Sequence, residues 1–113
     1  MDEDEDTVLA VLDDEYARAI LAHLTTEPMS VDELCTVCEM SDATAYRRLN
    51  RLQEVDLVAE QQEIDPDGHH YKRYTATVET VTVTFADGAY EVAVTRSTTD
   101  PADRFTDLFE GLS

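Results

Sequence analysis

The order of patterned segments between residues 14 and 77 most constrains the fold of this chain. Apolar residues first recur at helical spacing, a capping sequence then opens a second helix, and a third helix follows a short turn. A polar stretch interrupted by Asp65-Pro66-Asp67-Gly68 follows, and this turn sequence predicts a β-hairpin with strands at about 57–64 and 70–77. We therefore expect an α+β domain with a three-helix core and one hairpin beside it.

Each of the three helices has a predicted start and a predicted inward face. Asp13 or Asp14 can cap the first, and the sequence Ser30-Val31-Asp32-Glu33 is a capping box for the second. The third begins at Ser41 or Asp42 and runs to about Val55. The apolar stripe of the first helix comprises Tyr16, Ala17, Ile20, Leu21 and Leu24, and that of the third comprises Ala45, Leu49 and Leu52.

The chain divides into three parts within one domain. Residues 1–6 form an acidic run that we expect to be a disordered tail, and residues 7–77, which open with a short helix at Thr7–Leu12, form the main unit. In residues 78–113, Asp87-Gly88 predicts a second hairpin, and Asp100-Pro101 predicts the start of a terminal helix. The hairpin pairs Phe85 with Tyr90, Val83 with Val92 and Val81 with Val94, so one apolar face is expected to be buried against the domain or another subunit.

The outward face of the third helix is predicted to meet double-stranded DNA. A major groove about 12 Å wide admits one helix, and Arg can pair with guanine while Asn pairs with adenine. The side chains predicted to face the DNA are Thr44, Tyr46, Arg47, Asn50 and Arg51, with Arg48 at the flank facing a phosphate or a carboxylate. At the first hairpin, His69, His70, Lys72 and Arg73 are expected to touch the DNA backbone or minor groove. The alternative is a small helical domain with a solvated Arg face.

The charge of the chain bears on the choice between DNA binding and a solvated Arg face. The formal net charge is −18, with 26 acidic residues and 8 Lys plus Arg, of which five lie on the third helix and first hairpin. Positive charge retained in an anionic protein indicates an anionic partner. A composition so rich in acid and so poor in Lys is typical of halophiles, because in molar salt a Debye length of about 3 Å screens self-repulsion.

These segments resemble the winged helix-turn-helix of ArsR-type transcription regulators in their haloarchaeal form. The matching residues are DDEYARAILAHL, PMSVDEL, ATAYRRLNRLQEVDLV and DPDGHHYKRY. The resemblance covers residues 8–77 and implies a homodimer that binds a palindromic operator, with terminal helices at the dimer interface. It implies that Thr44, Tyr46, Arg47, Asn50 and Arg51 face DNA. The hairpin at 78–96 is not part of the minimal family core.

Cys35 and Cys38 are the only cysteines and lie three residues apart on the second helix. The sequence around them is similar to the Cys-Val-Cys box of metal sensors in this family, but the spacing differs. The two thiols share a face with Val31 and Leu34, so core packing is favoured over redox sensing and over metal sensing. His69 and His70 are predicted to be solvated residues of the hairpin rather than metal ligands.

Other classes of protein find less support in the sequence. There is no long apolar run for a membrane span and no Gly-rich phosphate loop or nucleophile with its base, so we expect a cytoplasmic, non-enzymatic protein without a cofactor. The competing hypothesis is a winged-helix protein-interaction module that does not bind DNA. The Arg and Asn residues of the third helix favour DNA over that alternative.

Overall fold

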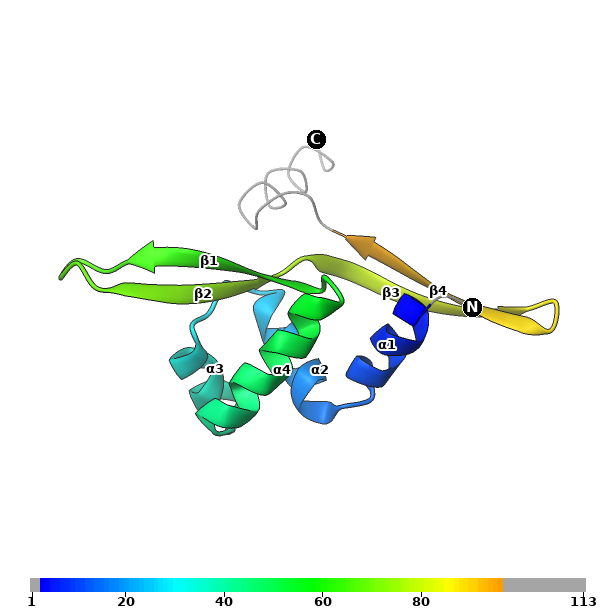
Figure 1. Cartoon of the computed structure of the whole chain (residues 1–113), viewed down its shortest axis with the longest axis horizontal. Coiled ribbons are helices and arrows are strands. Elements are labelled where there is room, and N and C mark those ends of the chain that lie inside the picture. The colour runs from blue at the N-terminus through cyan, green and yellow to red at the C-terminus, as the bar shows by residue number, and fades with distance from the viewer. Residues whose placement is uncertain (1–2, 97–113) are drawn as a thin grey trace.

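The computed structural model describes residues 3–96 (Figure 1). The helices are α1 (Glu3–Leu12), α2 (Glu15–Leu24), α3 (Val31–Cys38) and α4 (Asp42–Glu54), and the strands are β1 (Val58–Ile64), β2 (His70–Ala76), β3 (Val78–Ala86) and β4 (Ala89–Arg96). Helix α1 begins before the predicted Thr7 and takes in residues 3–6 of the predicted tail. The terminal helix predicted after Asp100 lies outside the described residues.

The predicted helix caps are confirmed. Asp14 accepts a hydrogen bond from the Ala17 amide at 3.2 Å and begins α2. Ser30 and Glu33 form the capping box of α3, and Ser41 accepts from the Thr44 amide at 3.2 Å to begin α4. Each cap satisfies an amide that the first turn of a helix leaves without a partner, so the three starts are fixed locally.

The predicted stripes of α2 and α4 form the centre of the hydrophobic core. Ile20, Leu49 and Leu52 are almost completely buried where α2 and α4 face each other. Tyr16 is an exception to the predicted stripe, because its side chain is exposed at the α2 surface. The remaining buried residues come from the four helices, the strands β1 to β3 and the segments that connect these elements, and are Val8, Val11, Ala17, Leu21, Leu24, Met29, Val31, Leu34, Ala45, Val55, Leu57, Val58, Tyr74, Ala76 and Val78.

Two antiparallel hairpins extend from this helical body in opposite directions (Figure 1). Strands β1 and β2 form the first hairpin, the wing, with Val58 opposite Ala76 and Ile64 opposite His70. The wing is joined to the loop before α3 by two backbone hydrogen bonds between Met29 and Tyr74, at 3.0 and 2.8 Å. This bridge sets the position of the wing relative to the helices.

The second hairpin, β3–β4, has the predicted register, with Phe85 opposite Tyr90 and Val83 opposite Val92. Val81, Val92 and Val94 pack against the core, but Val83 is exposed and 78% of the Phe85 side chain is accessible. The predicted burial of the apolar face is therefore confirmed only for its inner part. The outer part is bare because the hairpin extends beyond α1 (Figure 1).

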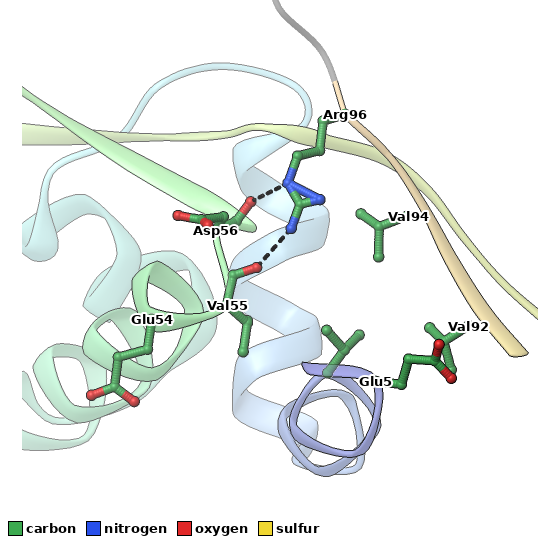
Figure 2. Close-up of a pocket in the computed structure, with 8 residues that line it drawn as sticks. Glu5, Glu54, Val55, Asp56, Val92, Val94 and Arg96 are labelled. Carbon is green, nitrogen blue, oxygen red and sulfur yellow. Dashed lines mark hydrogen bonds between the residues drawn. The ribbon is translucent and has the colours of Figure 1, made fainter. Parts of the chain in front are cut away.

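A cavity of about 280 Å³ lies where α1, the end of α4 and β4 meet (Figure 2). Its apolar walls come from Val8, Val55, Val92 and Val94, while Glu5, Glu54, Asp56 and Arg96 line the rest. Packing between the second hairpin and the helices is thus incomplete at this junction. Within residues 3–96, no helix is long and apolar enough to cross a membrane.

Candidate nucleic-acid interface

The turn between α3 and α4 sets the direction of α4. Glu39 adopts the left-handed conformation, with φ of 52°, and the Met40 amide donates to the Cys35 carbonyl at 3.2 Å. This arrangement closes α3, and Ser41 begins α4 two residues later. Only Met40 separates the left-handed Glu39 from the helix cap Ser41, so this short connection leaves the angle between the two helices little freedom.

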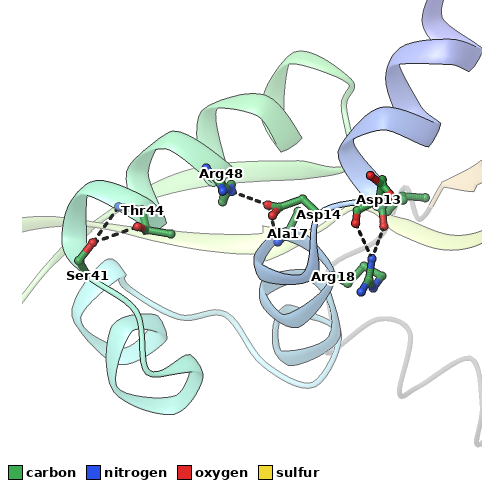
Figure 3. Close-up of polar contacts among 8 residues, drawn as sticks. Asp13, Asp14, Ala17, Arg18, Ser41, Thr44 and Arg48 are labelled. Carbon is green, nitrogen blue, oxygen red and sulfur yellow. Dashed lines mark hydrogen bonds and ion pairs between the residues drawn. The ribbon is translucent and has the colours of Figure 1, made fainter.

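The outer face of α4 presents several of the side chains predicted to meet DNA. Tyr46 is 51% exposed, Arg47 and Asn50 are exposed, and Arg51 is half-buried. The side chains of Arg47, Asn50 and Arg51 make no hydrogen bond or ion pair with any residue in the range 3–96, so their polar groups are free to bind solvent or a partner. Thr44 is half-buried, and its hydroxyl oxygen lies 3.0 Å from that of Ser41 (Figure 3).

Arg48 has a different environment from the other two arginines of α4. Its Nε donates to the Oδ2 of Asp14 (Figure 3). Its guanidinium also lies 5.7 Å from the centre of the Tyr16 ring. Of the two partners expected for Arg48, phosphate or carboxylate, the structure shows the carboxylate. Burial alone would raise the pKa of Asp14, but the hydrogen bonds from Arg48 and Ala17 outweigh it and lower that pKa.

The basic residues of the wing are partly engaged within the hairpin. Lys72 Nζ lies 3.7 Å from Glu60 Oε2 across the two strands, and the Lys72 side chain remains largely exposed. The Arg73 guanidinium lies 6.0 Å from the Tyr71 ring centre, and its Nε is buried without a hydrogen-bond partner among the described residues. Lys72 is thus the wing cation that can most easily reach a partner.

At the tip of the wing, Asp65 organises the turn. Its Oδ1 accepts from the amides of Asp67 and His69 at 2.9 and 2.8 Å, and Gly68 has φ of 86°. The structure also brings the ligand-type atoms of Asp65, Asp67 and His69 within 4.8 Å of one another. His69 itself is exposed, and its Nδ1 lies 3.5 Å from Asp65 Oδ2. His70 lies at the start of β2 and is exposed.

A hollow of about 370 Å³ joins the wing to the helices. Its lining residues come from the start of α3, the outer face of α4 and the strand β2, and they are Ser30, Val31, Asp32, Tyr46, His70, Tyr71 and Lys72. Sequence reasoning missed Ser30 and the start of α3 as part of this surface. Their position depends on the Met29–Tyr74 bridge, for which the sequence gives no local signal.

The two cysteines have the surroundings of packing residues. Both are half-buried against the core, and the Cys35 thiol donates to Asp42 Oδ1 at 3.2 Å. Burial, together with the Asp42 carboxylate, raises the pKa of Cys35 to about 11, and burial raises that of Cys38. A thiol held protonated is a weak nucleophile and a poor metal ligand, which supports the core-packing interpretation.

Comparison with known proteins agrees with this geometry. Residues 12–61 match a family model described as a helix-turn-helix domain, and no curated protein matches the chain. The protein has the α+β winged helix-turn-helix fold predicted from its sequence. A similar solved structure is reduced HlyU from Vibrio cholerae N16961, with 26% identity, a TM-score of 0.54, and coverage of 62% of this chain and 68% of that one. Together these findings support a DNA-binding transcription regulator.

Proposed function

We propose that this protein is a sequence-specific, ArsR-like transcription regulator of a halophilic archaeon that acts as a homodimer by occupying its operator. The observation that carries the proposal is the contrast among three arginines of one helix. Arg48 is held by Asp14, whereas the exposed Arg47 and the half-buried Arg51 form no side-chain hydrogen bond or ion pair with a described residue. In a chain of net charge −18, cations left without internal partners indicate an anionic ligand.

The proposed roles follow from the chemistry of base edges. Arg47 or Arg51 forms a bidentate pair with guanine, and Asn50 forms one with adenine, so these residues provide sequence specificity. Tyr46 and Thr44 contact the backbone or a thymine methyl group. On the wing, Lys72, Arg73, His69 and His70 contact the sugar-phosphate backbone and set the register of the protein on DNA.

In molar salt, the interactions that contribute most to DNA affinity differ from those in dilute buffer. Screening weakens long-range attraction of Arg for phosphate as much as it weakens repulsion by the carboxylates. Binding then rests on close hydrogen bonds, apolar contact and shape, and uptake of cations by the acidic surface replaces part of the usual counterion release. Affinity that falls steeply with rising KCl across the molar range would contradict this mechanism.

Selection of genomic fragments in molar KCl, followed by footprinting, tests the proposal. Wild type is expected to protect a palindromic site, and Arg47→Ala to lose about tenfold or more in affinity, since a bidentate base contact contributes roughly 1–3 kcal/mol. The matched control is Arg18→Ala, which removes the same charge from α2, where Arg18 donates to the Leu12 and Asp13 carbonyls (Figure 3).

The alternative function is a protein-interaction module. The exposed Phe85 and Val83 at the tip of β3–β4 are the specific observation in its favour, because exposed apolar side chains at a hairpin tip suit a protein contact. If wild type protects no DNA in native salt, and Arg47→Ala behaves as Arg18→Ala does, the regulator proposal fails and the interaction module replaces it.

A further inference from the structure

The end of α4 is closed by a motif that requires a left-handed residue. The Asp56 amide donates to the Gln53 carbonyl at 3.0 Å, and the Leu57 amide donates to the Leu52 carbonyl at 2.9 Å. This pair of bonds is the Schellman motif, in which glycine usually occupies the left-handed position. Here Asp56 occupies it, with φ of 58°, and an aspartate tolerates this conformation less well than glycine.

Residues far along the chain hold this strained turn in place. Thr77 Oγ1 donates to the Asp56 carbonyl at 2.9 Å, and Arg96 Nε donates to the same carbonyl at 3.2 Å. Arg96 Nη2 also donates to the Val55 carbonyl at 2.9 Å (Figure 2). A guanidinium at the C-terminal end of a helix also interacts favourably with the helix dipole. Arg96 therefore clamps the two carbonyl groups that directly follow α4, those of Val55 and Asp56.

The hairpin that carries Arg96 is itself attached to the helical body. Val92 and Val94 of β4 pack against the core, and the Tyr90 hydroxyl donates to Asp6 Oδ1 of α1 at 2.8 Å. Beside the clamp, however, the cavity of about 280 Å³ leaves the junction loosely packed. Hydrogen bonds from Thr77, between β2 and β3, and from Arg96 of β4 thus add to side-chain packing in holding the end of α4.

We propose that Arg96 is a positioning residue for DNA binding, and that the second hairpin is a brace for α4. The inference rests on the proposed function, since it concerns the helix that carries Arg47 and Arg51. Arg51 lies about one helical turn before the carbonyl groups that Arg96 holds. Backbone motion at Val55 and Asp56 would therefore also displace the Arg51 side chain. A recognition helix must be held closely in the position in which it binds. Part of that support comes from the second hairpin, which lies outside residues 12–61, the segment that matches the helix-turn-helix family model.

The test compares DNA affinity over a KCl series in which circular dichroism shows every variant to be folded. Arg96→Ala is expected to bind roughly tenfold more weakly than wild type, with an unchanged dependence of log affinity on log salt. Lys72→Ala, which removes a proposed phosphate contact, should instead change that slope by about one. A slope altered in Arg96→Ala would mean that Arg96 touches phosphate directly, which overturns a positioning role, as would an unchanged affinity.

Two further variants separate the brace from a general loss of folding. Thr77→Val removes one donor to the Asp56 carbonyl without changing charge, and Arg96→Lys keeps a cation that can reach one carbonyl. Thr77→Val is expected to weaken binding with the wild-type slope, and Arg96→Lys to recover part of the affinity. Affinity equal to wild type in Thr77→Val, or equal losses in the Lys and Ala variants of Arg96, would contradict the proposal.

Amide hydrogen exchange tests the brace even if the protein proves not to bind DNA. In Arg96→Ala, exchange should accelerate at residues 51–57 and stay unchanged in α2. Wild-type exchange at residues 51–57 in that variant would overturn the brace. Failure of wild type to bind DNA, with the exchange result as expected, would overturn the regulator function while leaving the clamp established.

Discussion

The guanidinium of Arg48 is bonded to the carboxylate of Asp14, the residue that caps α2, across 34 residues of sequence. Asp14 thus serves two helices: it accepts the Ala17 amide at the start of α2 and holds α4 through Arg48. The pair joins the helix proposed to read DNA to the helix that supports it. Its chemistry makes the stability of this contact dependent on pH.

Replacing Asp14 with Asn should remove the ion pair with Arg48 but keep the helix cap, because Asn caps helices as well as Asp does. We expect a loss of about 1 kcal/mol in the free energy of unfolding at neutral pH. The folded-state pKa of Asp14 is depressed below its ordinary value of 3.8, so its contribution is present above that value and lost as pH falls through the lower, folded-state pKa. Urea unfolding over this acid range should show a smaller pH dependence in Asp14→Asn; equal dependence would contradict the assignment.

Alanine variants of neighbouring arginines should separate stability from binding. Arg48→Ala leaves Asp14 without its ion-pair partner and removes the contact with Tyr16, and should lower the free energy of unfolding by about 1–2 kcal/mol. The exposed Arg47 side chain forms no hydrogen bond or ion pair with a described residue, so the free energy of unfolding of Arg47→Ala should stay within about 0.5 kcal/mol of wild type. Thermal unfolding in molar KCl measures both, and equal stabilities for the two variants would be evidence against the internal role of Arg48.

Asp56→Gly should stabilise the protein, because glycine adopts the left-handed conformation without a steric penalty. The expected gain is about 0.5–1 kcal/mol in the free energy of unfolding. Glu54→Gly is the matched control, since residue 54 lies within α4 and glycine there should be destabilising by a similar amount. A loss of stability in Asp56→Gly would show that the Asp56 side chain stabilises the turn.

The thiols should react slowly in the native protein. With the pKa of Cys35 raised to about 11, the thiolate is scarce at pH 8, and the rate of reaction with a disulfide reagent should be far below that of the urea-unfolded chain. Asp42→Asn should increase the rate at Cys35, because it removes the carboxylate that accepts from the thiol. Fast labelling of the folded wild type would revive the sensing interpretation.

The exposed tip of the second hairpin tests the proposed homodimer. If two copies meet there, Phe85→Asp should shift sedimentation in molar KCl from dimer to monomer, since it places charge in an apolar contact. Val37→Asp provides the control, because Val37 is exposed on α3, away from this hairpin. A dimer that persists in Phe85→Asp would place the interface on another surface.

Local chemistry explains how much of this structure could be predicted. The caps at Ser30 and Ser41 and the register about Asp87-Gly88 each depend on residues close in sequence, and all are confirmed. The partner of Arg48, the clamp by Arg96 and the bare side chain of Phe85 depend on tertiary placement. No spacing rule within one segment reveals which distant carboxylate or carbonyl will arrive beside an arginine. The DNA contacts themselves stay a prediction.

The clamp at the end of α4 has a consequence for how the molecule is made. A ribosome that has released α4 and the wing has not yet released Arg96, so the Val55 carbonyl acquires its Arg96 donor, and the Asp56 carbonyl its second donor, only when β4 emerges. In a nascent chain, or in a recombinant fragment that ends at residue 77, the C-terminal end of α4 would lack the hydrogen bonds from Arg96 and would be held less firmly. Under the proposed function, full affinity for an operator would then be gained only after β4 has left the ribosome.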